Sequence, residues 1–283
     1  MSNFARRKEF QPYRSKPFLH MNETTVSLDR LSIGYRTRQG TVTVADGLTA
    51  GIMSNRLTCL LGRNGVGKST LLRTLAGFQP ALGGTISIAG RQISDYSDRM
   101  LARTVGIVLT ERLDVQQMTV GELVALGRSP YTGFWGTLDS DDKRVVAQAI
   151  SDVGIMPLTD RMVSTLSDGE RQKTMIAKAL AQQTPVVLLD EPTAFLDYPS
   201  KVEMLLLLRR ISRQQQKTVF LSTHDVELAL QVADTVWLMD KGSTPLLTGT
   251  PQQLAADGQL TQFIEHSGNV VFNTETLSVK VKK

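Results

Sequence analysis

The segment at 62–70, which reads GRNGVGKST, has residue types and spacing suited to holding phosphate. It fits the P-loop pattern, whose fixed positions are occupied by Gly62, Gly67, Lys68 and Ser69. Glycines let backbone N–H groups turn inward around phosphate oxygens, and a helix beginning at Lys68 would direct its positive end at the same anion. The lysine ammonium would neutralise β- and γ-phosphate charge, and the Ser69 hydroxyl would be a Mg²⁺ ligand. The other predicted nucleotide contacts of this loop are Asn64, Gly65 and Thr70.

Two adjacent carboxylates, Asp190 and Glu191, follow the apolar run at 186–189. A carboxylate at the end of a buried strand can hold the Mg²⁺ shell of a bound nucleotide. Because adjacent side chains at a strand end point in different directions, we expect Asp190 to serve the metal together with Ser69. Glu191 is then the candidate general base for the water that attacks the γ-phosphate. The alternative is a solvated acidic rim, but the apolar run and the abrupt exit at Pro192 argue against it.

A second potential anion site lies at 166–170, which reads LSDGE. Here the hydroxyl of Ser167 and the N–H of Gly169 stand where a helix begins, so the positive end of that helix would face an anion. The chain therefore carries two phosphate cradles that are far apart in the sequence.

Strand and helix patterns alternate along the chain, which predicts an α/β fold with a largely parallel sheet. Helical patterns with few strand signals occupy about 110–180, and this indicates a helical subdomain inserted into the α/β core. The predicted strands are 57–61, 85–88, 104–109, 186–189, 218–222 and 235–239. The predicted helices begin near 68, 119, 139, 170, 200 and 226.

Over about residues 25–250, the order and spacing of these motifs resemble the nucleotide-binding subunit of an ATP-binding cassette (ABC) transporter. The resemblance implies a P-loop NTPase core with a small antiparallel β part near the N-terminus, and an Mg²⁺-dependent ATPase. It identifies 166–170 as the family's signature loop and 195–197, with Asp197, as the loop after the Walker B strand. It further implies that Tyr35 stacks on adenine and that His224 is the switch histidine.

The resemblance also implies partners. In the family, two copies form a head-to-tail homodimer in which the P-loop of one chain and the signature loop of the other hold one ATP. Ser167 and Gly169 would then serve the nucleotide of the partner, and closure on ATP with reopening after hydrolysis would drive the transport cycle. The stretch at 127–131 with 134–136 resembles importers of iron–siderophore, haem or vitamin B12. That subfamily implies membrane permease subunits, a substrate-binding protein and a peripheral location on the cytoplasmic face of a bacterial-type inner membrane.

Other interpretations stay open at this point. The residues at 127–131 could form a helix-ending loop whose aromatic side chains pack locally, while Phe134 and Trp135 could belong to a partner-docking surface. The cassette could also be a soluble ABC ATPase that works in assembly or repair without a permease. A third reading is a cassette that binds ATP without hydrolysing it, against which Glu191 and His224 argue.

Two positions depart from the family pattern. Thr110 stands where a glutamine should sense the γ-phosphate, and its shorter side chain leaves that role to a water or to Glu111; Gln116 and Gln117 lie too far along. The signature loop has Asp168 and Glu170 where Gly and Gln are usual. An added acid there should weaken phosphate binding unless nearby basic groups, Arg171 or Lys173, offset it.

Composition and charge exclude some classes. An apolar content of 41% and a charged content of 21% are ordinary for a globular protein. The longest apolar run, 204–208, is far short of the roughly 18 residues of a spanning helix. Residues 1–20 hold five basic residues and one acidic residue, so most of the net charge of +5 lies there and nucleic-acid binding is not expected.

We therefore expect three parts: a disordered basic extension at 1–20, the ABC ATPase domain at 21–250 and a short, weakly patterned tail at 251–283. Met21 as the true start is an alternative explanation of the extension, as is an arm that binds RNA or lipid. The single cysteine, Cys59, excludes an internal disulfide and is expected to be a buried small hydrophobe.

Overall fold

A six-stranded sheet forms the centre of the computed structural model, which describes residues 24–38, 40–110, 117–133, 136–241, 246–266 and 268–282. The strand order is β10-β9-β3-β8-β7-β6, and all neighbours are parallel except β9 and β10. Every residue of β3, β7 and β8 is buried, as expected for parallel strands covered on both faces. The bounds are β3 (Leu57–Gly62), β6 (Val105–Val108), β7 (Val186–Asp190), β8 (Thr218–Thr223), β9 (Thr235–Met239) and β10 (Leu246–Gly249).

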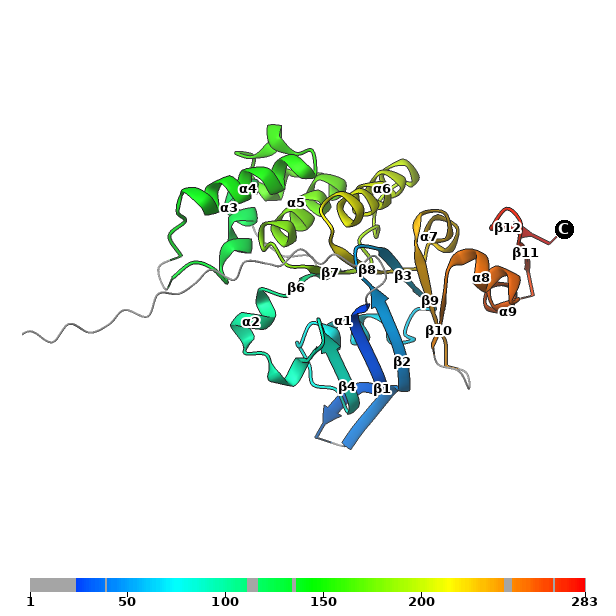
Figure 1. Ribbon diagram of the computed structural model, residues 1–283. Coiled ribbons are helices and arrows are strands. Elements are labelled where there is room, and N and C mark those ends of the chain that lie inside the picture. The colour runs from blue at the N-terminus through cyan, green and yellow to red at the C-terminus, as the bar shows by residue number, and fades with distance from the viewer. Residues whose placement is uncertain are drawn as a thin grey trace, which may run out of the picture.

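A second, antiparallel sheet comes from the N-terminal part of the described chain and lies to one side of the first (Figure 1). Its order is β2 (Gly40–Met53), β1 (Thr24–Thr37), β4 (Gly83–Ile88) and β5 (Arg91–Gln92). Helix α1 (Lys68–Leu75) buries Leu71, Leu72 and Leu75 in an apolar core shared by the two sheets. This arrangement confirms the expected α/β class with a small antiparallel part.

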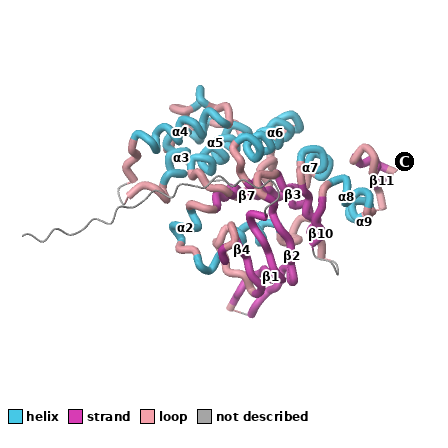
Figure 2. The backbone as a smooth tube through the Cα atoms, in the orientation of Figure 1, coloured by secondary structure: helices cyan, strands magenta, loops and turns pink. Residues whose placement is uncertain are grey.

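Helices cover the opposite face of the six-stranded sheet (Figure 2). The helices α3 (Val120–Ala125), α4 (Ser140–Asp152) and α5 (Asp168–Ala181) pack on one another in the inserted segment, and α6 (Tyr198–Gln214) and α7 (Val226–Val232) continue the layer. The short helix α2 (Asp98–Ala102) precedes β6. Single 3₁₀ turns occur at Ile93–Asp95, Leu126–Arg128, Met156–Leu158 and Val163–Thr165.

Local sequence explains where the helices of the inserted segment begin. Thr119, Asp139 and Ser167 each accept a hydrogen bond from the backbone N–H three residues later, and an acidic side chain at that position reciprocates. Such capping boxes satisfy backbone N–H groups that otherwise have no partner in the first helical turn. The helix starts expected near 119 and 139 are therefore confirmed.

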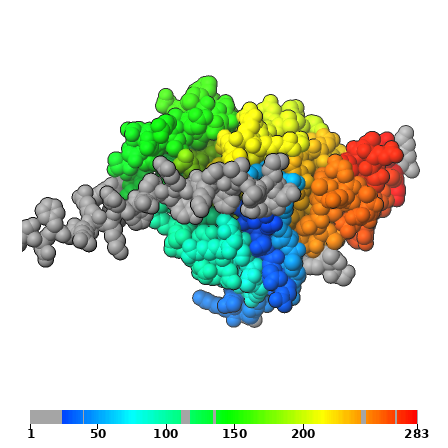
Figure 3. Space-filling view, viewed as in Figure 1, coloured from blue at the N-terminus to red at the C-terminus, as the bar shows by residue number. Residues whose placement is uncertain are grey.

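The C-terminal residues are more ordered than their weak sequence pattern indicates. They form α8 (Pro251–Ala256), α9 (Gln259–Glu265) and a hairpin of β11 (Val270–Asn273) and β12 (Ser278–Val281). Phe272 is buried in the main core, and the N–H of Val279 donates to Oε1 of Glu227 on α7 at 2.6 Å. Figure 3 shows this red segment against the orange helices at one end of the molecule. Residues 1–23 lie outside the described residues, so the basic extension stays a prediction, as do the domain limits.

Two further expectations concern buried and apolar features. Cys59 is fully buried in β3 as predicted, and burial, followed by the charge of Asp234, raises the pKa of its thiol. Within the described parts of the chain, no helix combines the length and apolar character that crossing a membrane requires.

Candidate active site

Four neighbouring strands bring the predicted motifs to one edge of the sheet. The P-loop follows β3, His224 follows β8, Asp190 ends β7 and Thr110 follows β6. Because β3, β8, β7 and β6 are parallel, their carboxyl ends all lie at that edge. The carboxyl ends of strands in open α/β sheets are where ligands bind.

The P-loop backbone adopts conformations that require glycine. Gly67 has φ +117°, and a Cβ atom there would lie only 2.5 Å from Cγ1 of Val44. Gly65 has φ +74°, another value that L-residues rarely adopt. Asn64 is exposed in the same turn. The loop therefore presents its backbone in the manner that phosphate binding needs.

Side chains around the P-loop are held in defined positions. Lys68 is only 5% exposed, and its Nζ donates to the carbonyl oxygen of Gly62 at 2.8 Å. Ser69 is exposed, so its hydroxyl is accessible to an ion. The hydroxyls of Tyr35 and Thr70 are hydrogen-bonded at 2.5 Å, which places Tyr35 beside the start of α1 with 44% of its surface exposed. Stacking of its ring on adenine stays a prediction.

The structure brings three predicted charged or titratable groups together. Nζ of Lys68 lies 3.4 Å from Oε1 of Glu191, and Nδ1 of His224 lies 3.5 Å from Oε2 of the same carboxylate. Asp190 is 5% exposed and accepts a hydrogen bond from the Ser222 hydroxyl at 2.6 Å. The Glu191 carboxylate therefore lies beside both the Lys68 ammonium and the His224 imidazole, while the Asp190 carboxylate is oriented separately by Ser222.

Sequence reasoning missed Ser222. The available signal was a hydroxyl side chain inside TVFLST, a strand that is buried along its whole length. Buried hydroxyls need hydrogen-bond partners, so such a residue beside a strand that ends in carboxylates indicates an orienting contact.

Thr110 occupies the position where the family pattern has glutamine, and its short side chain reaches the neighbouring strand. Its hydroxyl donates to the carbonyl oxygen of Asp190 at 2.8 Å. The side chain therefore bonds to the backbone of the neighbouring strand end. Glu111 and Gln116, which the sequence brought into consideration, lie outside the described residues, whereas Gln117 is exposed.

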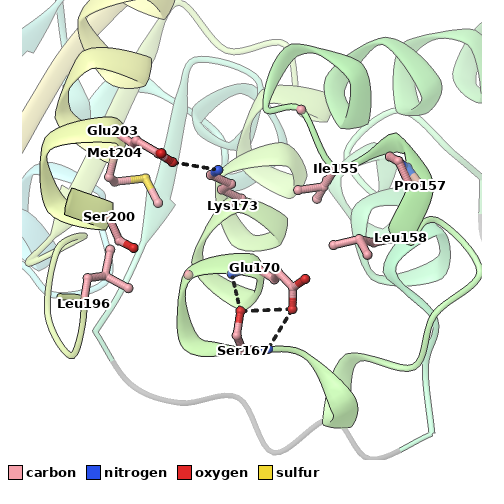
Figure 4. Close-up of a pocket in the computed structure, with 12 residues that line it drawn as sticks. Ile155, Pro157, Leu158, Ser167, Glu170, Lys173, Leu196, Ser200, Glu203 and Met204 are labelled. Atoms are coloured by element: carbon pink, nitrogen blue, oxygen red, sulfur yellow. Dashed lines mark hydrogen bonds and ion pairs between the residues drawn. The ribbon is translucent and has the colours of Figure 1, made fainter.

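Ser167 and Gly169 lie at the start of α5, on the wall of a pocket of about 380 Å³ (Figure 4). The opposite wall includes Leu196, Ser200 and Met204, and no P-loop residue is among the described residues that line the pocket. The structure therefore does not join the signature loop to the P-loop of the same chain through this pocket.

The Ser167 side chain forms a reciprocal pair with Glu170. The Ser167 N–H and hydroxyl donate to Oε2 of Glu170 at 2.9 and 3.0 Å, and the Glu170 N–H donates back to the hydroxyl at 3.3 Å. The bonds from the Ser167 backbone and side chain lower the pKa of the Glu170 carboxyl. Arg161 lies 3.7 Å from the same carboxylate, and the charges of Arg161 and Lys173 also lower its pKa, so the suggested Lys173 and a cation that was not suggested partly offset the acid.

Asp197, predicted to contact nucleotide, caps α6 by accepting a hydrogen bond from the Ser200 N–H at 3.1 Å. Hydrogen bonding to Ser200 lowers the pKa of this carboxyl. The capping contact explains the position of Asp197, and a nucleotide contact stays a prediction.

The stretch at 127–131 is largely structural. Arg128 is buried and bonds Asp142 at 2.8 Å, and the Tyr131 hydroxyl donates to the Gln182 carbonyl at 2.9 Å. These contacts support the interpretation as a locally packed loop. Phe134 and Trp135 lie outside the described residues, so their docking role stays untested.

Comparison with known proteins decides the family. The model of the ABC transporter family matches residues 45–194. The chain belongs to this family. An ABC transporter ATP-binding protein of Methanocaldococcus jannaschii, itself uncharacterised, is 38% identical over 80% of this chain and 76% of its own length. The ferric enterobactin transport ATP-binding protein FepC of Escherichia coli is 35% identical over 83% and 85%, respectively. An ABC transporter assigned to the metal-chelate type, solved in an inward-facing conformation, superposes with a TM-score of 0.73 at 26% identity, covering 86% of this chain and 90% of that one.

Membership in the ABC transporter family confirms the predicted activity class. ATP hydrolysis is general to the family, so the chain is an ATP-binding subunit with ATPase activity. The cassette fold of the solved relative agrees with the two sheets and the helical layer described above.

Proposed function

We propose that this ABC ATPase energises the uptake of a metal chelate, of the iron–siderophore, haem or cobalamin type, through a separate membrane permease. It would act as a peripheral subunit on the cytoplasmic face of a bacterial-type inner membrane, with a substrate-binding protein delivering the chelate. The observation that carries the ATPase part is the convergence of Lys68, Glu191 and His224 at the strand ends. The substrate class is supported by the relatives named for ferric enterobactin and for metal chelates.

The residues divide the work at this edge of the sheet. P-loop N–H groups and the Lys68 ammonium hold the β- and γ-phosphates. Glu191 orients the attacking water and accepts its proton at a carboxylate oxygen. His224, whose Nδ1 is 3.5 Å from Glu191, positions that carboxylate against the γ-phosphate.

The residues present also fit Mg²⁺. Ser69 and Asp190 supply hard oxygen donors, and Mg²⁺ typically keeps waters and substrate phosphates as its other ligands. The described residues contain no group of three or more His, Cys, Asp and Glu side chains, which suits an ion held mainly by the nucleotide. When bound, Mg²⁺ would neutralise charge that develops on the phosphates.

The signature loop supports a homodimer with ATP at the interface. Among the described residues, a Cβ atom on Gly169 would meet only Cδ2 of Leu196, at an ordinary distance of 3.9 Å, so packing against them does not require glycine there. The start of α5 is exposed at Ser167, and once the hydroxyl leaves its bond with Glu170 it would suit the phosphates of a nucleotide held by a second copy. Two such sites follow from two-fold symmetry.

Substitution of Glu191 by Gln tests the catalytic assignment. We expect Glu191→Gln to bind ATP with the parent's affinity and to lose at least about 100-fold in kcat, because the amide cannot accept the proton. The measurements are binding of a fluorescent ATP analogue and steady-state Mg-ATPase kinetics. Parent-like turnover in the variant would show that Glu191 is not the base.

A separate experiment tests the transport role. The tagged chain is purified from detergent-solubilised membranes, and uptake of a radiolabelled ferric siderophore is compared between the parent and Glu191→Gln. We expect a polytopic membrane protein to co-purify and uptake to depend on Glu191. Exclusively soluble partners would favour the alternative, an ABC ATPase of assembly or repair.

A further inference from the structure

The peptide bond between Asp190 and Glu191 is held from both sides. On one side the hydroxyl of Thr110, two residues after the end of β6, donates to the Asp190 carbonyl oxygen at 2.8 Å. On the other side the Glu191 N–H donates to the Ser222 hydroxyl on β8 at 2.9 Å. Because β7 lies between β8 and β6, the carbonyl oxygen and the N–H of this one peptide are hydrogen-bonded from the two neighbouring strand ends, one on each side. We name Thr110 and Ser222 the hydroxyl clamp.

The same clamp orients a side chain. The Ser222 hydroxyl, fully buried, donates its one proton to Oδ1 of Asp190 at 2.6 Å. Its lone pairs remain available to accept the Glu191 N–H. Ser222 thus fixes the direction of the Asp190 carboxylate and the position of the next residue at once.

The backbone conformation of Glu191 is one that surrounding contacts must hold in place. Its φ of +46° lies in the left-handed region, which a residue with a side chain rarely occupies. Such a conformation persists where surrounding contacts impose it, and it occurs preferentially at functional sites. Here it accompanies a carboxylate that lies 3.4 Å from Lys68 and 3.5 Å from His224.

We propose that Thr110 and Ser222 are positioning residues for ATP hydrolysis. The hydroxyl clamp holds the Asp190–Glu191 peptide so that Asp190 remains with the metal shell while Glu191 faces the attacking water. Thr110 therefore acts on the backbone that carries the base, in place of the phosphate sensing expected of a longer side chain at its position. This inference rests on the proposed role of Glu191.

The test removes one hydroxyl of the clamp and keeps the side-chain shape. Thr110→Val is compared with Thr110→Ser, which restores the donor, and with Thr104→Val as a matched control. The Thr104 hydroxyl also donates to a backbone carbonyl at 2.8 Å, that of Met100, but just before β6 begins. Steady-state Mg-ATPase kinetics of the full-length chain and thermal unfolding are measured for each variant.

We expect Thr110→Val to lower kcat about tenfold with KM for Mg-ATP within about twofold of the parent, since a small misplacement of a catalytic group slows chemistry more than binding. Thr110→Ser should recover most of the lost kcat, and Thr104→Val should match the parent. Thr110→Ala provides a second hydroxyl deletion, and it should reproduce the loss.

Several outcomes would overturn the proposal. One is a kcat of Thr110→Val within twofold of the parent, and another is an equal loss of kcat in Thr110→Ser. A third is a loss of kcat in Thr110→Val that is matched by a loss of thermal stability and is shared by the control Thr104→Val. Glu191→Gln, measured in parallel, separates the two claims. If Glu191→Gln loses turnover and Thr110→Val does not, the clamp proposal fails while the role of Glu191 stands. If Glu191→Gln retains turnover, the role of Glu191 fails first, whatever Thr110→Val shows, and the clamp loses its basis.

Discussion

Buried polar side chains at the strand ends are each matched by a partner. Lys68 has the Gly62 carbonyl and the Glu191 carboxylate, and Asp190 has the Ser222 hydroxyl. Removing a charge from water is costly unless hydrogen bonds and an opposite charge replace the lost hydration. These pairings therefore offset the cost of burying Lys68 and Asp190 and hold their side chains in place.

The buried Lys217 side chain provides a test, at the level of a single residue, of how burial of a charge affects the stability of the fold. Burial lowers the pKa of this side chain from 10.5 to about 8, and its Nζ donates to the Thr184 carbonyl. Between pH 8 and 10.5 the unfolded chain binds a proton that the folded chain has released, so the unfolding free energy rises with pH. The free energy of unfolding of the parent, relative to that of Lys217→Met, should therefore rise by about 3 kcal/mol from pH 8 to 10.5, at 1.36 kcal/mol per pKa unit.

Urea unfolding at a series of pH values measures this difference. The exposed Lys143 provides the matched control, because Lys143→Met should show a difference from the parent that does not change with pH. A flat difference for Lys217→Met would mean that the buried ammonium is not destabilised.

Individual elements differ in how strongly local sequence defines them. The helices of the inserted segment start at capping boxes, which adjacent residues build without help from the rest of the chain. In the C-terminal part, α8 also begins at a capping box, formed by Thr250 and Gln253, whereas the hairpin of β11 and β12 is ordered by contacts with the core through Phe272 and with Glu227 on α7. Because α7 begins just after His224, the C-terminal hairpin contacts the helix that follows this histidine.

Phe272→Ala tests that support. Phe272 is 5% exposed, so its truncation should cost about 3 kcal/mol of stability through lost burial and a residual cavity. Hydrogen exchange should speed up in β11, β12 and α7 and change little in β3 and β7. Val281→Ala is the control, since Val281 is 79% exposed and its truncation should leave exchange unaltered. Unchanged protection of α7 in Phe272→Ala would show that the hairpin does not stabilise that helix.

At the scale of the whole molecule, one chain carries two separate features that we propose bind phosphate. The P-loop lies at the sheet edge with Glu191, whereas Ser167 and Gly169 lie at the start of α5 beside the pocket of Figure 4. Their separation within the chain is what a head-to-tail dimer requires, because each nucleotide is then completed by the other copy.

Gly169→Ala distinguishes a role in assembly from a role in folding. Alanine favours helix over glycine, and space for its methyl group is available, so the free energy of unfolding should rise by about 0.5 kcal/mol. The added methyl group would lie where the partner's nucleotide must approach the backbone. ATP-dependent dimerisation, measured by light scattering in the Glu191→Gln background, should therefore weaken at least about tenfold.

Gly133→Ala is the matched control, because a Cβ atom there meets none of the described residues within 4 Å and the site is remote in sequence from the signature loop. It should dimerise like its Glu191→Gln parent. Normal dimerisation of Gly169→Ala would argue against a nucleotide contact at the signature loop.

The sequence alone determined the features that depend on neighbouring residues. The P-loop spacing, the Asp190–Glu191 pair, the helix starts near 119 and 139 and the burial of Cys59 all follow from local pattern, and the structure agrees with each. The sequence also predicted Lys68 from the P-loop pattern, Glu191 from its place after a buried strand and His224 from the family resemblance, and the structure brings the three side chains together.

Only the tertiary structure decided which strand ends are neighbours. The sheet places β8 between β3 and β7, with β6 beyond, although β8 comes after all of them in the chain. That order makes Ser222 a partner of Asp190 and makes Thr110 a donor to its carbonyl. Strand order arises from burial of whole sheet faces, a long-range property that residue spacing does not encode. For the same reason, the packing of the C-terminal hairpin could not be predicted from its weakly patterned residues.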